Sequence, residues 1–251
     1  GAHQGSPGRG GYFSPWTIPP LENADVPEGT YLTDYLTDQT LELLRDKDER
    51  PFFLNLWYYT VHTPIQAKPE KIAKYEAKAK AMGLDQVQTF AEGEHFPCEH
   101  KQGQRVKRRL VQSDPVYAAM IESLDENLGR LFDLLDQLGE AENTIVFFTS
   151  DNGGLATAEG SPTCNAPLAE GKGWMYEGGT RDPLLVRWPG HIAASSTCPT
   201  PITSPDFYPT ILELAGLDPI PEQHCDGASF APLLRGEDFD RGPLFWHYPH
   251  Y

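Results

Sequence analysis

An acidic residue and a carboxamide stand side by side at the end of a short apolar run. Residues 144–149 (TIVFFT) are apolar or β-branched and are bounded by polar and glycine residues, which predicts a buried strand. Asp151 and Asn152 follow this run, with Gly153 and Gly154 behind them. Ligands of open α/β sheets bind just beyond the carboxyl ends of strands, and hard oxygen donors suit Ca²⁺ or Mg²⁺. We therefore interpret Asp151 and Asn152 as candidate metal ligands, with an ordinary Asp-Asn-Gly-Gly turn as the alternative.

Two more side chains with catalytic chemistry stand in turn-forming contexts. Lys172 lies between two glycines, which allow the backbone to approach a ligand closely while the ammonium offers a point charge to an anion. His62 follows the aromatic run 51–59 (PFFLNLWYY), which is apolar on both faces as a central parallel strand would be. Pro64 favours an extended residue before it, so His62 is presented at the end of that strand. A solvated loop lysine and a structural histidine are the alternatives.

Taken together, these segments resemble the formylglycine-dependent sulfatases, the arylsulfatase-like family. The resemblance is carried by residues 62–64 (HTP), 149–154 (TSDNGG), 171–173 (GKG), 176–183 (YEGGTRDP) and 188–190 (WPG). It implies an α/β fold with a mostly parallel sheet flanked by helices, the alkaline-phosphatase-like fold, here in incomplete form. It also implies hydrolysis of sulfate esters, with a sulfated carbohydrate or another sulfate ester as the substrate.

The resemblance assigns a role to each candidate residue. Asp151 and Asn152 match the family's metal ligands, for Ca²⁺ or alternatively Mg²⁺. Lys172 matches the lysine that contacts the sulfate, and His62 matches the histidine near the leaving oxygen. Two loop residues are expected to be structural: Glu177 and Arg181. Three further candidates for contact with the substrate stand near the end of the chain: His247, Tyr248 and His250.

The chain also departs from the family pattern. The family's nucleophile is a formylglycine made from the cysteine or serine of a C-x-P-S-R-type motif, and all four cysteines here stand in other settings: Cys98, Cys164, Cys198 and Cys225. Their pairing is open. The family's paired aspartates and its K-x-H element lie upstream of the matching segment, and a small sheet lies beyond it. We therefore expect residues 1–251 alone to be inactive and to bind metal weakly, with the formylglycine in an upstream segment.

The rest of the chain reads as the central part of a sulfatase catalytic domain spanning 1–251. We predict an N-terminal loop at 1–32 with an aromatic stretch that packs onto the fold, a core at 33–81 and 114–251, and a variable insertion at 82–113. The alternation of strands and helices favours a parallel sheet. Helices are predicted from Thr33, over 67–81, from Asp114 to Gly139 and over 206–215, and strands over 51–59, 144–149, 183–188 and 243–247. Within the third helix, residues 125–127 are expected to face solvent. The basic cluster 105–109 is either a contact for a sulfated polymer or a charged surface.

Composition limits the partners. Asp and Glu number 36 against 20 Lys and Arg, a net charge of −16, which argues against nucleic acid as a partner. A local positive pocket can still hold an anionic substrate. No signal peptide or membrane-spanning helix is predicted within the chain, and a periplasmic or secreted location is implied by the family alone. The sequence does not indicate an oligomeric state.

Two other functions stay open. A metal-dependent phosphate or phosphonate ester hydrolase of the same superfamily would use the same metal chemistry at a strand end. A non-catalytic glycan-binding relative would keep the fold without a nucleophile, and the upstream sequence would distinguish it from an enzyme.

Overall fold

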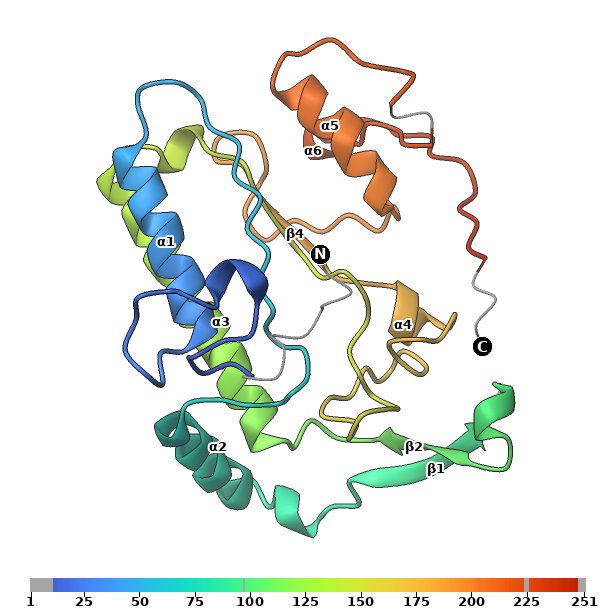
Figure 1. Ribbon diagram of the computed structural model, residues 1–251. Coiled ribbons are helices and arrows are strands. Elements are labelled where there is room, and N and C mark those ends of the chain that lie inside the picture. Colours follow the sequence, from blue (N-terminus) through green and yellow to red (C-terminus); the bar gives the residue numbers. More distant parts are fainter. Residues whose placement is uncertain (1–10, 97, 224–225, 248–251) are drawn as a thin grey trace. The chain divides into compact units, whose positions relative to one another are not determined.

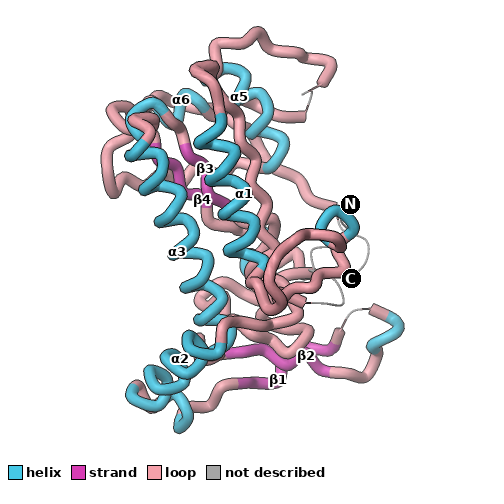
Figure 2. The backbone as a smooth tube through the Cα atoms, turned by 60° about the vertical axis from the view of Figure 1, so that its left-hand side comes forward, coloured by secondary structure: helices cyan, strands magenta, loops and turns pink. Residues whose placement is uncertain are grey.

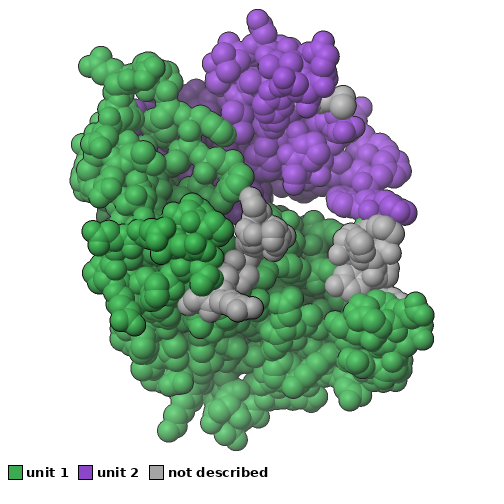
Figure 3. Space-filling model, in the orientation of Figure 1, with its two compact units in different colours: residues 1–139, 150–183, 250–251 green, residues 140–149, 184–249 purple. Residues whose placement is uncertain are grey.

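The computed structural model describes residues 11–96, 98–223 and 226–247 of the chain. The chain divides into two compact units, which Figure 3 colours separately. Unit 1 comprises residues 1–139, 150–183 and 250–251, and unit 2 comprises residues 140–149 and 184–249. The predicted candidates Tyr248 and His250 lie outside the described residues.

Three helices frame unit 1 (Figure 1): α1 (Leu32–Asp46), α2 (Pro69–Ala81) and α3 (Pro115–Gln137). Helices α1 and α3 lie side by side in both backbone views (Figures 1 and 2), and α2 packs against α3. Proline occupies the first turn of α2 and α3, where its missing N–H has no helical partner to lose. The Asp114 side chain caps α3 by accepting from the N–H groups of Val116 and Tyr117, each at 3.0 Å. The predicted helices in this unit are therefore confirmed.

The contact between α1 and α3 is polar at Asn127, which is only 2% exposed. Its Nδ2 donates to Asp34 Oδ1 at 2.8 Å and to Ser123 O at 2.7 Å. The prediction that residues 125–127 face solvent holds for the first two, which are exposed, and is wrong for Asn127. The reason is helical periodicity, because position 127 shares a helix face with the buried residues Ser123 and Leu131, each four positions away.

The N-terminal aromatic stretch packs onto the fold as predicted. Tyr12, Trp16 and Tyr31 are at most 3% exposed and belong to the main hydrophobic cluster. The Tyr12 hydroxyl donates to Tyr59 O at 2.7 Å and to His62 O at 2.9 Å. This loop therefore fixes the backbone of the segment that carries His62.

The strands assigned in the described residues form two antiparallel pairs. In unit 1, β1 (Phe90–His95) pairs with β2 (Arg105–Arg109), so the predicted insertion is largely a hairpin. In unit 2, β3 (Val146–Thr149) pairs with β4 (Leu184–Arg187), as Figure 2 shows. We expected parallel pairing at this point. The connection over residues 150–183 is long enough to return the chain in either direction, so the order of elements did not fix the strand direction.

Two predicted strands, 51–59 and 243–247, are not assigned as strands in the structure. Burial alternates along 51–59, with Phe53 72% and Trp57 78% exposed. On the other face the Tyr58 hydroxyl contacts Thr37 Oγ1 of α1 at 2.8 Å. The segment is extended as predicted, but a strand is defined by the backbone of a neighbour, and no strand of the described residues pairs with it.

Unit 2 contains α5 (Phe207–Leu214) and the short α6 (Ala231–Leu234) beside the β3–β4 pair. Phe147 of β3 meets Phe207 and Phe230 edge to face, with ring centroids 5.9 and 6.0 Å away. The predicted helix over 206–215 is confirmed as α5. Unit 1 also contains a one-turn helix, α4 (Glu177–Thr180). In the part of the chain that the structure describes there are five short 3-10 turns: Pro19–Leu21, Leu84–Gln86, Glu99–Lys101, Ala141–Asn143 and Ser204–Asp206. No helix of the described residues has both the length and the apolar character needed to cross a membrane.

Candidate active site

The loop over residues 150–182 is built by close approach of glycine backbones. The Gly153 N–H donates to Gly179 O at 3.2 Å. A Cβ placed on Gly153 would lie 1.8 Å from Gly178 O, which is closer than any real side chain comes to a carbonyl. Gly153 is therefore required by contact with the Glu-Gly-Gly-Thr turn, and Gly154 by contact with Asn165 and Thr163, because a Cβ there would lie 2.6 Å from Asn165 Oδ1.

The same packing positions Lys172. Its N–H donates to Gly154 O at 3.1 Å, and a Cβ on Gly171 would lie 2.2 Å from that same oxygen. The Asn165 side chain links the Asp-Asn-Gly-Gly segment to the residue before Gly171, because its Nδ2 lies 2.7 Å from Gly154 O and 2.9 Å from Glu170 O. The Asp-Asn-Gly-Gly and Gly-Lys-Gly segments, which are separate in sequence, are one packed body in space.

His62 and Lys172 meet directly. Lys172 Nζ lies 2.8 Å from His62 Nε2 although 110 positions separate them in the chain. An ammonium has only donors, so Nε2 is the acceptor, and the ring proton is then on Nδ1, 3.0 Å from Thr63 O. Thr63 Oγ1 in turn donates to Glu159 Oε2 at 2.9 Å, which ties the His-Thr-Pro turn to the loop. Both side chains of the pair are half-buried, an arrangement in which an incoming anion can reach two nitrogen groups at once.

The two predicted metal ligands lie in the same unit and on the same loop as Lys172. Asp151 is exposed and Asn152 is half-buried. The Asn152 Nδ2 donates to Gly153 O at 3.1 Å, so its nitrogen is used by the loop and its oxygen is the end suited to a cation. Residues Glu177 and Arg181 pair at 3.4 Å across α4 with both side chains about two-thirds exposed, and His247 is an exposed residue of unit 2.

Asp182 is a site residue that the sequence reasoning missed. Its Oδ1 is buried without a hydrogen-bond partner among the described residues. Burial, together with the negative charge of Asp151, raises the pKa of Asp182 to about 6. The only sequence signal is an acidic residue just before β4, and its relation to Asp151 exists only in the folded chain.

These donors fit a hard divalent cation. A cation near Asp151 and Asp182 would offset the repulsion between the two carboxylates and would give the orphaned Asp182 oxygen a partner. The described residues contain no group of three or more His, Cys, Asp or Glu side chains arranged to hold a metal. The fit is therefore that of a partial ligand set, made of these carboxylates and the Asn152 oxygen.

The basic cluster 105–109 is largely used inside the fold. Arg108 forms an ion pair with the buried Glu170. Arg109 is 7% exposed, and its guanidinium donates to Ser161 O at 2.5 Å. Two of the cluster's charges therefore hold the hairpin to the site loop instead of meeting a polymer.

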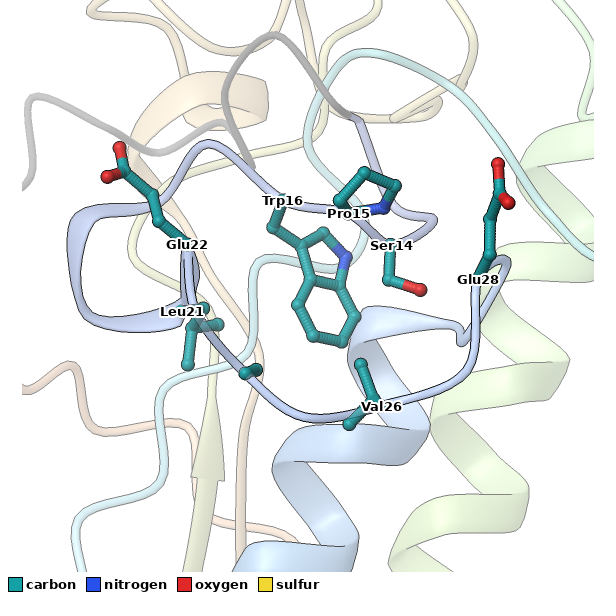
Figure 4. A pocket seen from close by; sticks show the side chains of 8 residues that line it. Ser14, Pro15, Trp16, Leu21, Glu22, Val26 and Glu28 are labelled. Carbon is teal, nitrogen blue, oxygen red and sulfur yellow. The ribbon is translucent and has the colours of Figure 1, made fainter.

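A separate pocket of about 290 Å³ lies in the N-terminal loop and contains none of the predicted site residues. Figure 4 shows the Trp16 indole between Leu21 and Val26, with the carboxylates of Glu22 and Glu28 at the two sides. Two carboxylates make this pocket unsuited to an anionic ester.

Solved structures identify the fold. The crystal structure of Ps i-CgsB in complex with k-i-k-neocarrahexaose superposes with a TM-score of 0.65 at 30% identity, covering 85% of this chain and 40% of that one. The phosphonate monoester hydrolase of Agrobacterium radiobacter gives a TM-score of 0.56 at 22% identity, covering 84% of this chain and 43% of its own. The fold is thus that of the alkaline-phosphatase-like hydrolases, as the sequence resemblance implied.

Sequence comparison gives the family. The sequence model of the sulfatase family matches residues 4–217. A sulfatase of Formosa agariphila is 37% identical over 93% of this chain and 40% of its own length, and the human N-acetylgalactosamine-6-sulfatase is 39% identical over 52% of this chain and 25% of its own. The chain belongs to the sulfatase family. It spans less than half the length of these relatives.

Proposed function

We propose that this chain is part of an enzyme that hydrolyses sulfate esters of a sulfated carbohydrate, with His62 and Lys172 at the sulfate. The observation that carries the proposal is the 2.8 Å contact between these two side chains. Lys172 stands on the loop whose glycines also bring Asp151 and Asn152 into the same packed body. The family supports the reaction type. The names and ligands of similar proteins, an N-acetylgalactosamine-6-sulfatase and a complex with k-i-k-neocarrahexaose, support a carbohydrate as the substrate.

The chemistry required of the site follows from the reaction. Cleavage of a sulfate ester leaves negative charge on the sulfate oxygens and on the departing oxygen. Lys172 supplies a fixed positive charge to the former. His62, once protonated, donates from Nε2 to the leaving oxygen, because that nitrogen already faces the position of the Lys172 ammonium. An anion that enters between them replaces the lysine–histidine contact with one contact to each group.

A divalent cation, Ca²⁺ or Mg²⁺, would be held by Asp151 and Asn152 and would withdraw charge from the sulfate oxygens. The orphaned carboxylate oxygen of Asp182 supports the presence of a cation here. The nucleophile is proposed to be a formylglycine supplied by a segment outside these residues, since no cysteine of the chain stands in a C-x-P-S-R-type motif. Residues 1–251 on their own are therefore expected to be inactive. Export to the periplasm or the exterior is proposed from the family alone.

The test is an assay of the intact protein on a chromogenic aryl sulfate, in EDTA and in excess Ca²⁺, beside residues 1–251 alone. We expect Ca²⁺-dependent sulfate release by the intact protein and none by the shorter chain. Binding of Ca²⁺ measured by calorimetry, with Asp151→Asn as the variant, tests the metal site without reference to turnover. Turnover by residues 1–251 alone would refute the assignment of the nucleophile.

A second function has its own support, because one of the similar folds is a phosphonate monoester hydrolase. The same assay with an aryl phosphate and a phenylphosphonate ester separates the two. Faster cleavage of a phosphorus ester than of the sulfate ester would overturn the sulfatase assignment. Binding of a sulfated glycan with no cleavage of any ester by the intact protein would indicate the non-catalytic relative.

A further inference from the structure

A row of aromatic side chains begins two residues after Lys172. The ring of Trp174 lies 6.2 Å from that of Tyr176, with the planes 30° apart. On its other side it lies 6.2 Å from the ring of Phe96, at 34°. Lys101 then places its ammonium 4.7 Å from the centre of the Phe96 ring. We refer to Phe96, Lys101, Trp174 and Tyr176 as the aromatic ledge.

The ledge joins two parts of unit 1 that are far apart in sequence. Phe96 and Lys101 belong to the segment between β1 and β2, whereas Trp174 and Tyr176 belong to the site loop that ends in α4 (Figure 1). Trp174 is anchored at both of its N–H groups, because its backbone donates to Gly171 O at 3.0 Å and its indole donates to the buried Thr157 hydroxyl at 3.0 Å. Its ring is therefore held in place two residues along the chain from the lysine that we propose to contact sulfate.

The ledge is accessible. Tyr176 is 48% exposed and Phe96 and Trp174 are half-buried. Ring faces carry partial negative charge and attract the C–H groups of a sugar, which carry partial positive charge, while the hydroxyl groups of the sugar stay in water. These partly exposed rings, which begin two residues after Lys172, offer apolar faces to a carbohydrate.

The charge at the far end of the row fits an anionic sugar. The segment 90–109 carries five Lys and Arg residues against three Glu, in a chain of net charge −16. Arg108 and Arg109 are used in ion pairs within the fold, with Glu170 and with Asp114. Lys101 lies over a ring instead, and this contact leaves the ammonium able to meet an anion.

We propose that the aromatic ledge is a subsite for a neighbouring sugar of a sulfated oligosaccharide. The sugar stacks on the exposed ring of Tyr176, and Lys101, at the Phe96 end of the ledge, pairs with a sulfate of the same oligosaccharide, while the sugar that bears the cleaved ester lies at His62 and Lys172. This inference rests on the proposed function for its choice of ligand. It adds to that function a preference for chains over single sugars, and it gives the hairpin of residues 90–109 a role in selecting substrate.

The test is affinity electrophoresis of the intact protein in gels containing chondroitin sulfate, heparin or κ-carrageenan, each beside its desulfated form. We expect retardation in at least one sulfated polymer and less in its desulfated form. Phe96→Ala, Tyr176→Ala and Lys101→Ala should each weaken the retardation roughly three- to tenfold as a dissociation constant. Tyr176→Phe keeps the ring and should restore most of the binding. Lys78→Ala, an exposed lysine of α2, is the matched control for loss of a charge.

The outcomes distinguish this inference from the proposed function. The proposed subsite is refuted if no polymer retards the protein. It is also refuted if the ledge variants are retarded as strongly as the unsubstituted protein. A loss confined to Lys101→Ala refutes it as well, because that result indicates general attraction of charge without stacking. Sulfate release from the small aryl ester is measured in parallel. If sulfate is released but the ledge variants bind the polymers as well as the unsubstituted protein does, the subsite is refuted and the hydrolysis stands. If binding depends on the ledge but no sulfate is released, the hydrolysis is refuted and the subsite stands. Thermal unfolding of each variant must match that of the unsubstituted protein.

Discussion

Two regions of unit 1 reach their shape by opposite means. In the site loop the backbones touch because side chains are absent, as at Gly153, where an added Cβ would lie 1.8 Å from Gly178 O. In the α1–α3 pair the contact depends on a side chain, because the Asn127 amide donates across the interface to Asp34 of α1, while its other hydrogen bond, to Ser123 O, stays within α3. The loop therefore does not tolerate a larger residue in place of a glycine such as Gly153, whereas the helix pair is sensitive to loss of the Asn127 side chain. A loop built on backbone contacts leaves the long side chain of Lys172 available to reach His62.

The largest effect is expected from a substitution that disrupts the site loop, residues 150–182. Gly153→Ala forces a methyl group into the Gly178 carbonyl, so the loop must open, at a cost on the order of 3 kcal/mol or more in the free energy of unfolding and with loss of activity. Thermal denaturation and sulfate release measure the two. The matched control is Gly129→Ala in α3, where an added Cβ meets nothing within 4 Å. It should stabilise the helix by about 0.5–1 kcal/mol, and equal behaviour of the two variants would contradict the comparison.

The next effect separates the chemistry of the loop from its shape. Lys172→Ala and His62→Ala remove the proposed charge and the proposed acid without touching a glycine contact, so kcat should fall by about 100- to 1,000-fold while the melting temperature stays the same. Steady-state kinetics on an aryl sulfate measures this. Lys74→Ala, an exposed lysine of α2 paired with Glu122, should leave kcat unchanged. A similar loss in that variant would show that the effect is one of overall charge.

The helix pair is tested through its own critical group. Asn127→Ala removes three hydrogen bonds from a buried position, two that its amide donates and one that it accepts from Arg130, and takes one partner from Asp34, so unfolding should become easier by about 1–3 kcal/mol. Urea denaturation followed by circular dichroism gives the value. Activity per folded molecule should be unchanged, because the site loop makes no use of this contact. An active-site defect without loss of stability would contradict the division between the two regions.

The smallest effect is the dependence of stability on pH. The pKa of Asp182 is raised to about 6 by burial and by Asp151, so the folded chain holds that proton more firmly than the unfolded chain does. The favourable contribution is present at low pH and is lost as pH rises through about 6. The loss begins above the ordinary pKa of 3.8, so in EDTA Asp182→Asn should raise the melting temperature more at pH 8 than at pH 5 and change it little below about pH 3.8. An increase that is equal at pH 8 and pH 5 would mean that Asp182 does not titrate in this way.

The sequence by itself determined the helices and the family. The regular spacing of apolar residues and the proline and aspartate at the start of α3 are local signals, and local hydrogen bonding makes a helix without reference to distant residues. The segments shared with the family could be identified from the sequence because glycines at fixed positions mark where backbones must touch. The same reading picked out His62, Lys172, Asp151 and Asn152, and their catalytic and metal roles stay predictions.

Tertiary structure decided the rest. The direction of β4 depends on which backbone lies beside it, and the extended run 51–59 becomes a strand only with a partner, so neither follows from pattern. The hydrogen bond from Asn127 to Asp34, the raised pKa of Asp182 and the row of rings from Phe96 to Tyr176 each depend on residues that are distant in the chain and adjacent in space. A sequence reports what a residue can do, and folding selects the neighbours that determine whether it does so.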